Sequence, residues 1–330
     1  MRRVGQRDLK RSRWWVGPWL CLLVIAAAGP RSPRFASETD VKIAAFDFGA
    51  KPVPIWANGA LVAVDEMDAL TPTFHIFNRN GVEVRTAQFS IPGSNWLRVR
   101  GYSVGPDGSV AVCGDATDQR GQVGFYLALL PARGGQARIV QTFPYSPQAI
   151  AVAPDGSIWT KGLEYDPSRP KLGRLATRPA DVIRHFDASG KFLGSFLEQT
   201  TMTRGELESG LSNLAASASV VGWYQGGASN YYELSRDGSV KRWPALRLAA
   251  REHVMRLAIT DSGDVFVAKL VPNKKSEVYR LDRGAGTWIP VTLSAPPGNQ
   301  PAPDTIVGAS GDTLVGFSSA GTLCFLRLAD

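Results

Sequence analysis

The sequence predicts an all-β fold built from many short strands and tight turns. Its 330 residues include 34 Gly and 22 Pro but only 4 Met, a composition that favours turns over long helices. One hairpin-like phrase also recurs, as "VGPDGSVAV" from Val104, "VAPDGSIW" from Val152 and "ITDSGDVFV" from Ile259. The recurrence indicates that one structural unit is repeated along the chain.

The Pro-Asp-Gly phrase predicts a β-hairpin. Pro presets φ for the first turn position, the Asp side chain can accept a hydrogen bond from nearby backbone, and Gly takes a positive φ. The flanking residues alternate between apolar and polar or run apolar, as half-buried and buried strands do. Each phrase is therefore interpreted as the first two strands of a unit.

The hairpins recur about every 48 residues, with one double gap. The double gap contains a degenerate copy near Ala218, "NLAASASVVGWY", whose turn has no glycine. A second turn follows each first hairpin, so every unit is predicted to have four strands. The turn glycines of the first hairpins are Gly59, Gly108, Gly156, Gly263 and Gly311, and those of the second are Gly81, Gly134, Gly135, Gly190, Gly238 and Gly284.

Six four-stranded repeats of this length predict a six-bladed β-propeller over residues 37–330. The sixth unit lacks one strand, because only "TLVGF" and "TLCFLRL" follow Gly311. The segment "VKIAAFDF", residues 41–48, is expected to supply the missing strand and to leave no open sheet edge. A sandwich of unrelated hairpins is the alternative.

The phrases "PDGSV", "PDGSIW" and "SRDGSV" resemble the six-bladed propellers of the TolB-like and NHL-repeat type. The resemblance rests on turn motifs, so it implies a fold more than a function. Proteins of this kind include protein-binding scaffolds, metal-dependent lactone hydrolases and quinone-dependent sugar dehydrogenases. None of the enzyme motifs of those groups matches positions in this sequence.

Residues 1–36 are predicted to be a leader and linker. A basic stretch precedes an apolar run from Val16 to Ala28, which is short for a membrane span and suits a signal peptide. Adding Trp14 and Trp15 brings the run closer to a short N-terminal anchor helix. A cleaved signal and an uncleaved anchor both place the remainder outside the cytoplasm, as a periplasmic, extracellular or membrane-tethered protein.

The net charge of +8 is concentrated in this leader. Removing its eight Lys and Arg and its single Asp from the totals of 37 basic and 29 acidic residues leaves 29 and 28. A nearly neutral domain offers no broad field for phosphate groups, so nucleic acid is excluded as an expected partner. Cys113 and Cys324 could pair after export, but free buried thiols are the commoner outcome for such apolar segments.

Candidate binding residues are expected on the face opposite the turns and at the mouth of the central channel. The loop from residue 162 to 181 is the longest between the second and third strands of any unit, and long loops often bind ligands. When the repeats are aligned on their turn glycines, a second group of candidate residues falls at the starts of the innermost strands, where these residues could bind an anion or a sugar. The loop residues are Glu164, Tyr165, Asp166 and Arg169, and the second group is Arg98, Arg100, Gln148, His253, Met255 and Asp304.

No metal or cofactor is expected. His75, His185 and His253 fall on different units, and the acids of the connecting loops, including Asp65 and Asp115, lack a complete calcium-binding spacing and are expected to be solvated. Nucleophile elbows, P-loops and paired CxxC motifs are absent. The sequence favours a monomeric binding scaffold for a protein or carbohydrate. The alternative is a hydrolase or oxidoreductase with its site at the channel mouth.

Overall fold

The computed structural model describes residues 32–43, 46–48, 51–167, 175–176, 180–202, 213–225, 230–235, 237–249, 251–271, 275–294 and 302–329. The chain divides into two compact units, Met1–Arg31 and Ser32–Asp330, and only the second falls within these ranges. The predicted signal peptide or anchor helix therefore lies outside the described residues, as does Arg169. Within the described ranges, no helix has the length and hydropathy needed to span a membrane.

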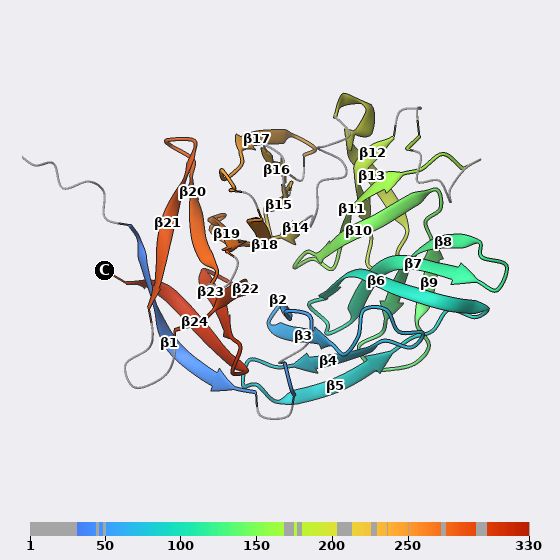
Figure 1. Ribbon diagram of the computed structural model, residues 1–330, viewed down its shortest axis with the longest axis horizontal. Helices are drawn as coiled ribbons and strands as arrows, with labels where there is room; N and C mark the ends of the chain where they lie inside the picture. The colour runs from blue at the N-terminus through green and yellow to red at the C-terminus, as the bar shows by residue number, and fades with distance from the viewer. Residues whose placement is uncertain are drawn as a thin grey trace, which may run out of the picture. The chain divides into compact units, whose positions relative to one another are not determined.

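Four of the sheets are four-stranded, and each is built from four strands that follow one another along the chain (Figure 1). The first sheet consists of β2 (Ile55–Ala57), β3 (Ala60–Val64), β4 (Thr73–Phe77) and β5 (Glu83–Gln88). The second consists of β6 (Ser94–Val104), β7 (Val110–Asp118), β8 (Val123–Leu130) and β9 (Arg138–Gln141). The third consists of β10 (Tyr145–Val152), β11 (Ile158–Glu164), β12 (Asp181–Phe186) and β13 (Phe192–Glu198). The fourth consists of β14 (Asn213–Ala216), β15 (Val220–Tyr224), β16 (Asn230–Ser235) and β17 (Val240–Pro244).

The fifth sheet has eight strands in the order β18-β19-β20-β21-β1-β24-β23-β22. The strands of the fifth sheet are β18 (His253–Ile259), β19 (Val265–Leu270), β20 (Glu277–Asp282), β21 (Thr287–Ser294), β22 (Thr305–Ser310), β23 (Thr313–Ser318), β24 (Thr322–Ala329) and β1 (Arg34–Lys42). Outside the sheets, a single turn of 3-10 helix, η2 (Gln199–Thr201), follows β13.

The all-β propeller arrangement is present, but the expected six separate blades are not. The described strands form four four-stranded sheets and one eight-stranded sheet. The eight-stranded sheet arises because β1 pairs with strands on both of its sides. It pairs antiparallel with β24 along one edge and parallel with β21 along the other, through Arg34, Phe35 and Ala36. Two quartets that would be separate blades are thereby joined by backbone hydrogen bonds.

The N-terminal strand pairs with the last strands of the chain, as predicted, but it uses different residues. It spans residues 34–42 instead of 41–48, and therefore begins within the expected linker. Pairing from Arg34 opposite Ala329 to Lys42 opposite Thr322 uses the whole length of β24, so later residues have no strand partner there. Phe46 and Phe48 instead pack edge-on against each other, with ring centroids 4.6 Å apart, and Phe48 packs against Phe317 at 4.8 Å.

The first-hairpin turns form as the sequence predicts. The Asp107 carboxylate accepts a hydrogen bond from the Ser109 N–H at 2.9 Å, and Gly108 has φ of 84°. Such a bond holds the turn in the conformation that only glycine adopts without strain. The second-hairpin turn of the eight-stranded sheet differs, because Gly286 and not Gly284 has the positive φ.

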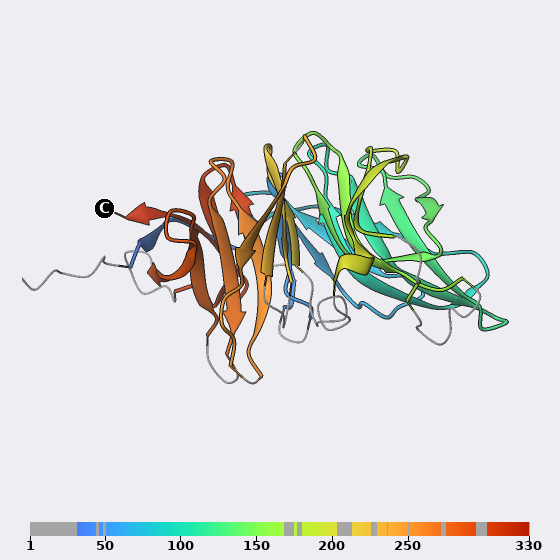
Figure 2. The same ribbon diagram turned by 90° about the horizontal axis from the view of Figure 1, so that it is seen from above.

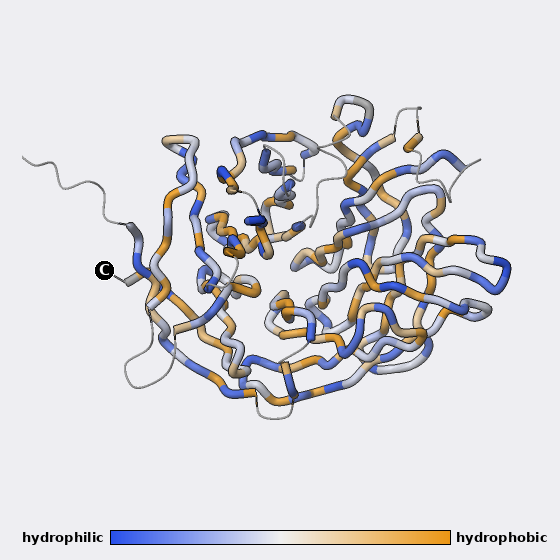
Figure 3. Tube along the Cα trace, in the orientation of Figure 1, coloured by the Kyte–Doolittle hydropathy of each residue, from blue (hydrophilic) through white to orange (hydrophobic). Residues whose placement is uncertain are grey.

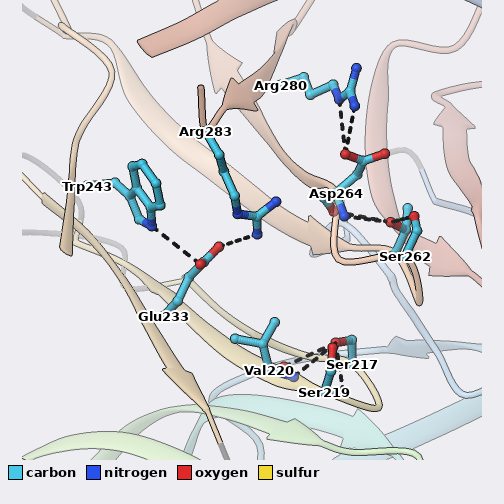
Figure 4. A network of polar contacts seen from close by, with 10 residues as sticks. Ser217, Ser219, Val220, Glu233, Trp243, Ser262, Asp264, Arg280 and Arg283 are labelled. Atoms are coloured by element: carbon cyan, nitrogen blue, oxygen red, sulfur yellow. Dashed lines mark hydrogen bonds and ion pairs between the residues drawn. The ribbon is translucent and has the colours of Figure 1, made fainter. Parts of the chain in front are cut away.

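The degenerate turn near Ala218 is stabilised by serine instead of Asp and Gly. The Ser217 hydroxyl accepts hydrogen bonds from the backbone N–H groups of Ser219 and Val220, at 3.4 and 3.3 Å (Figure 4). A side chain of this kind can replace the backbone interactions that define a turn. The four-strand repeat therefore continues although its sequence signature is lost.

The hydrophobic core lies between neighbouring sheets. Hydrophobic residues are interspersed with hydrophilic ones along the chain (Figure 3), and strands such as β3 and β11 are buried along nearly their whole length, so each sheet presents apolar side chains to its neighbours. One buried cluster joins the first and second sheets and includes Phe74 and Tyr102, and another joins the third and fourth and includes Trp159 and Trp223. The innermost strands β2, β6, β10, β14, β18 and β22 face a common central region (Figures 1 and 2).

Candidate functional site

A cavity of about 860 Å³ occupies this central region. Its lining comes from all six innermost strands, as Ile55, Tyr102, Ile150, Leu214, Leu257 and Val307 illustrate. It also includes residues of the first-hairpin turns, so the cavity extends along the length of these strands. The volume is in the range of small-molecule sites in proteins, about 300 to 1,000 Å³.

Four lining residues occupy β-bulges. In β6, β10, β18 and β22 the pairing with the next strand skips Arg100, Gln148, Met255 and Val307, and β6 has a second skip at Asn95. A bulge leaves the extra residue unpaired and turns its side chain away from the regular alternation. All four line the cavity, so four of the six innermost strands present a side chain to the centre from a bulge.

Arg256 extends across the cavity from β18. Its Nη2 donates a hydrogen bond to the carbonyl oxygen of Val53, just before β2, and its Nη1 donates to the carbonyl oxygen of Met255 at 3.3 Å. The hydroxyl of Tyr102 reaches the same Val53 oxygen at 3.4 Å. Burial lowers the pKa of Arg256 and raises that of Tyr102 to about 12, so the tyrosine stays neutral at physiological pH.

Arg100 and Gln148 bring further polar groups to the lining. Nε of Arg100 donates to the buried carboxylate of Asp115 at 2.6 Å. Oε1 of Gln148 accepts a hydrogen bond from Nζ of Lys161 at 2.8 Å, which leaves the amide NH₂ of Gln148 as its donor. Burial lowers the pKa of Lys161 to about 8.

An aromatic row leads from the cavity to the surface. Tyr165 lines the cavity and stacks on Phe125, with ring centroids 5.8 Å apart. Phe125 stacks in turn on Phe143 at 6.0 Å, and Phe143 is 41% exposed. Aromatic faces beside hydrogen-bonding groups are typical of sites that bind ligands with both apolar and polar surfaces.

The structure brings together only part of the predicted site. Arg100, Gln148, Tyr165 and Met255 line the cavity, whereas Arg98, His253, Asp304, Glu164 and Asp166 are not among its described lining residues. Aligning the repeats placed residues along each strand but did not give the direction of their side chains. A bulge adds one residue, so side chains before and after it do not follow one alternating pattern.

Arg98 and Asp304 have structural partners away from the cavity lining. Nε of Arg98 donates to Asp68 at 2.7 Å, and its guanidinium lies 4.9 Å from the centre of the Trp96 ring. Burial acts to raise the pKa of Asp304, but hydrogen bonds from the Ser319 N–H and from Lys275 outweigh it and lower the pKa. The remaining described candidate of this group, His253, pairs with Leu270 at the start of β18.

Asp115, expected to be a solvated loop acid, and Glu164, expected in a ligand-binding loop, are both buried. Glu164 ends β11 and accepts a hydrogen bond from Nη2 of Arg184 at 2.7 Å. Asp115 lies within β7, beneath Arg100. Both strands extend further than the sequence indicated, which carries these carboxylates into the sheet, where an arginine stabilises each one.

The sequence interpretation missed Arg256, Tyr102 and Asn213. Asn213 lines the cavity and its Nδ2 donates to the carbonyl oxygen of Val254 at 2.9 Å. Arg256 directly follows Met255, and an alternating strand would place only one of these two neighbours toward the centre. The bulge at Met255 lets both residues line the cavity, and the sequence around Met255 contains no pattern that predicts a bulge.

Among the described residues, no group of three or more His, Cys, Asp and Glu side chains is arranged to hold a metal ion. The three histidines lie on three different sheets, in β4, β12 and β18. Cys113 and Cys324 are both buried and free, and burial raises the pKa of the Cys324 thiol to about 12. These thiols are therefore poor nucleophiles at neutral pH.

No protein-family model matches the sequence, and no curated protein matches it. Among solved structures, virginiamycin B lyase from Staphylococcus aureus aligns with 88% of this chain and 99% of its own, at 11% identity and a TM-score of 0.47. TolB from Acinetobacter baumannii aligns with 83% of this chain and 65% of its own, at 13% identity and a TM-score of 0.46. Such remote likeness does not transfer an activity, and it does not decide between the TolB-like and NHL types.

Proposed function

We propose that this chain is a binding protein whose central cavity takes up a small polar ligand of carbohydrate size. The observation that carries the proposal is the cavity itself, which is lined by bulged side chains of several strands and by Tyr165. Sugars present apolar faces and hydroxyl edges, which an aromatic ring and the donors of Gln148 and Arg100 complement.

The fold offers a rigid frame for such binding. Most residues that line the cavity belong to strands, and neighbouring sheets bury large side chains against one another, such as Trp223, which is fully buried. Preorganised side chains bind without a large loss of conformational freedom. We infer that β18–β21 and β22–β24 with β1 act as two adjoining blades, which makes this a six-bladed ring of the TolB-like or NHL type.

An exported location, periplasmic, extracellular or tethered to a membrane through the leader, remains part of the proposal. The alternative of a hydrolase or oxidoreductase built from Arg98, Arg100, His253 and the facing acids has less support, because only Arg100 of these three named residues is among the described residues of the cavity lining. A protein partner is also less favoured, since a deep central cavity suits a small molecule better than a flat surface.

Calorimetric titration of the full chain with a panel of mono- and disaccharides tests the proposal. At least one saccharide should bind, and Tyr165→Ala should weaken it about 5-fold to 10-fold through the loss of ring contact. Phe192→Ala is the matched control, because Phe192 is 51% exposed on β13 and is not a described lining residue. Equal weakening by both substitutions, or binding of no saccharide, would contradict the proposal.

A further inference from the structure

The described lining of the central cavity contains two arginines, and their charges are balanced differently. Arg100 has a carboxylate partner in Asp115, with 2.6 Å between Nε and Oδ1. The acceptors of Arg256 are the carbonyl oxygens of Val53 and Met255, which carry no full charge. No carboxylate forms an ion pair with Arg256 among the described residues.

The other groups near Arg256 do not supply the missing negative charge. The described lining contains one acid, Asp261, which lies at the first-hairpin turn between β18 and β19. Tyr102 shares the Val53 oxygen with Arg256, but burial keeps it protonated, with a pKa of about 12. The Nε of Arg256 is shielded from solvent and has no hydrogen-bond partner among the described residues.

A guanidinium in such a place is costly unless an anion accompanies it. Removing a cation from water carries a penalty that a nearby counter-charge offsets. Arginine is also the residue best suited to carboxylate and phosphate groups, since it carries five N–H donors in a planar fork. Two carbonyl acceptors leave several of these donors for a ligand.

We propose that the ligand of the central cavity carries an anionic group, a carboxylate or a phosphate, and that Arg256 binds this group. This inference rests on the proposed function and specifies its ligand class as an acidic sugar or a sugar phosphate. Tyr102 would turn its single hydroxyl hydrogen from the Val53 carbonyl oxygen to the same anion, and Gln148 would donate from its amide NH₂. The electrostatic part of the binding would weaken as salt is added.

Calorimetry with matched ligands tests this inference. Glucuronate and glucose differ only in a carboxylate against a hydroxymethyl group, and glucose 6-phosphate and inorganic phosphate separate the two anion types. At least one of the anionic ligands should bind with an affinity at least about 10-fold higher than that of glucose, as expected for charge-assisted hydrogen bonds. Raised salt should reduce this preference.

Arg256→Gln should abolish the preference for the anion, and Arg256→Lys should restore part of it because the charge is kept without the planar fork. Arg98→Gln is the matched control, since Arg98 is engaged with Asp68 and is not a described lining residue. Circular dichroism of each variant confirms folding, and the lysine variant preserves the test should the glutamine variant unfold.

The outcomes separate the inference from the proposed function. Equal affinity for glucose, glucuronate and glucose 6-phosphate, or an anion preference that survives Arg256→Gln, would overturn the inference and leave carbohydrate binding intact. Binding of inorganic phosphate that depends on Arg256, without binding of any sugar, would support the inference and overturn the carbohydrate proposal. Absence of binding by all four ligands would overturn both.

Discussion

Arg256, in the eight-stranded sheet, and Arg283, in a turn between two strands of that sheet, have opposite electrostatic surroundings. Arg283, in the turn after β20, reaches into the fourth sheet and donates to the buried carboxylate of Glu233, which also accepts a hydrogen bond from Trp243 at 3.3 Å (Figure 4). Arg256 donates to backbone carbonyls and has no described carboxylate partner. The contrast indicates that Arg283 stabilises the folded protein by pairing with Glu233, whereas Arg256 keeps N–H donors that a ligand could use.

The largest expected effect is on stability, from Arg283→Met. The Glu233 side chain is only 6% exposed, so the substitution leaves a buried carboxylate without its cation. The free energy of unfolding should fall by about 3 kcal/mol, measured by urea denaturation. Arg280→Met is the matched control, because its pair with Asp264 is more exposed, at 33% and 36%, and should contribute less than about 1 kcal/mol. An equal loss of the free energy of unfolding in both variants would contradict the expected difference between the buried and the exposed ion pair.

A second test concerns Lys161, a buried cation close to the cavity. Its pKa is lowered to about 8 in the folded protein and returns to about 10.4 on unfolding, so the unfolded chain binds more protons between these values. Stability should therefore rise by about 2 kcal/mol from pH 8 to pH 10, in addition to changes from other groups. Lys161→Met should remove this rise, and an identical pH profile in both proteins would contradict the assignment.

The smallest expected change in stability is that of Arg256→Gln. The substitution loses hydrogen bonds to two carbonyl oxygens but relieves the burial of a charge that has no described carboxylate partner. The two effects oppose each other, so the free energy of unfolding should change by less than about 1 kcal/mol. A loss as large as that of Arg283→Met, measured in the same denaturation series, would make Arg256 a structural residue.

Much of the fold could be predicted because its signals are local. The turn at Gly108 depends on Asp107 and Ser109, which flank this glycine in the sequence, and the same bond recurs between Asp155 and Ser157 at 3.0 Å. The number of separate sheets could not be predicted in this way. It depends on β1, which contacts both β21 and β24 from the opposite end of the chain.

The candidate site was predictable only in part, for a related reason. Aligning the repeats identified Arg100, Gln148 and Met255, since each stands at the same position before its turn glycine. It could not show that Arg98 is engaged with Asp68 or that Glu164 is buried against Arg184. Those outcomes depend on bulges and on strand lengths, which pairing between neighbouring strands decides.

By itself, the sequence determined the strand-and-turn repeat, because hairpin turns depend on the φ preferences and side-chain hydrogen bonds of adjacent residues. Only the tertiary structure decided which side chains share the centre. The bond from Arg256 to Val53 joins residues from opposite parts of the chain, and the burial that leaves this charge without a described carboxylate exists only once the sheets have assembled. Desolvation is a property of the packed molecule, so no local pattern of residues encodes it.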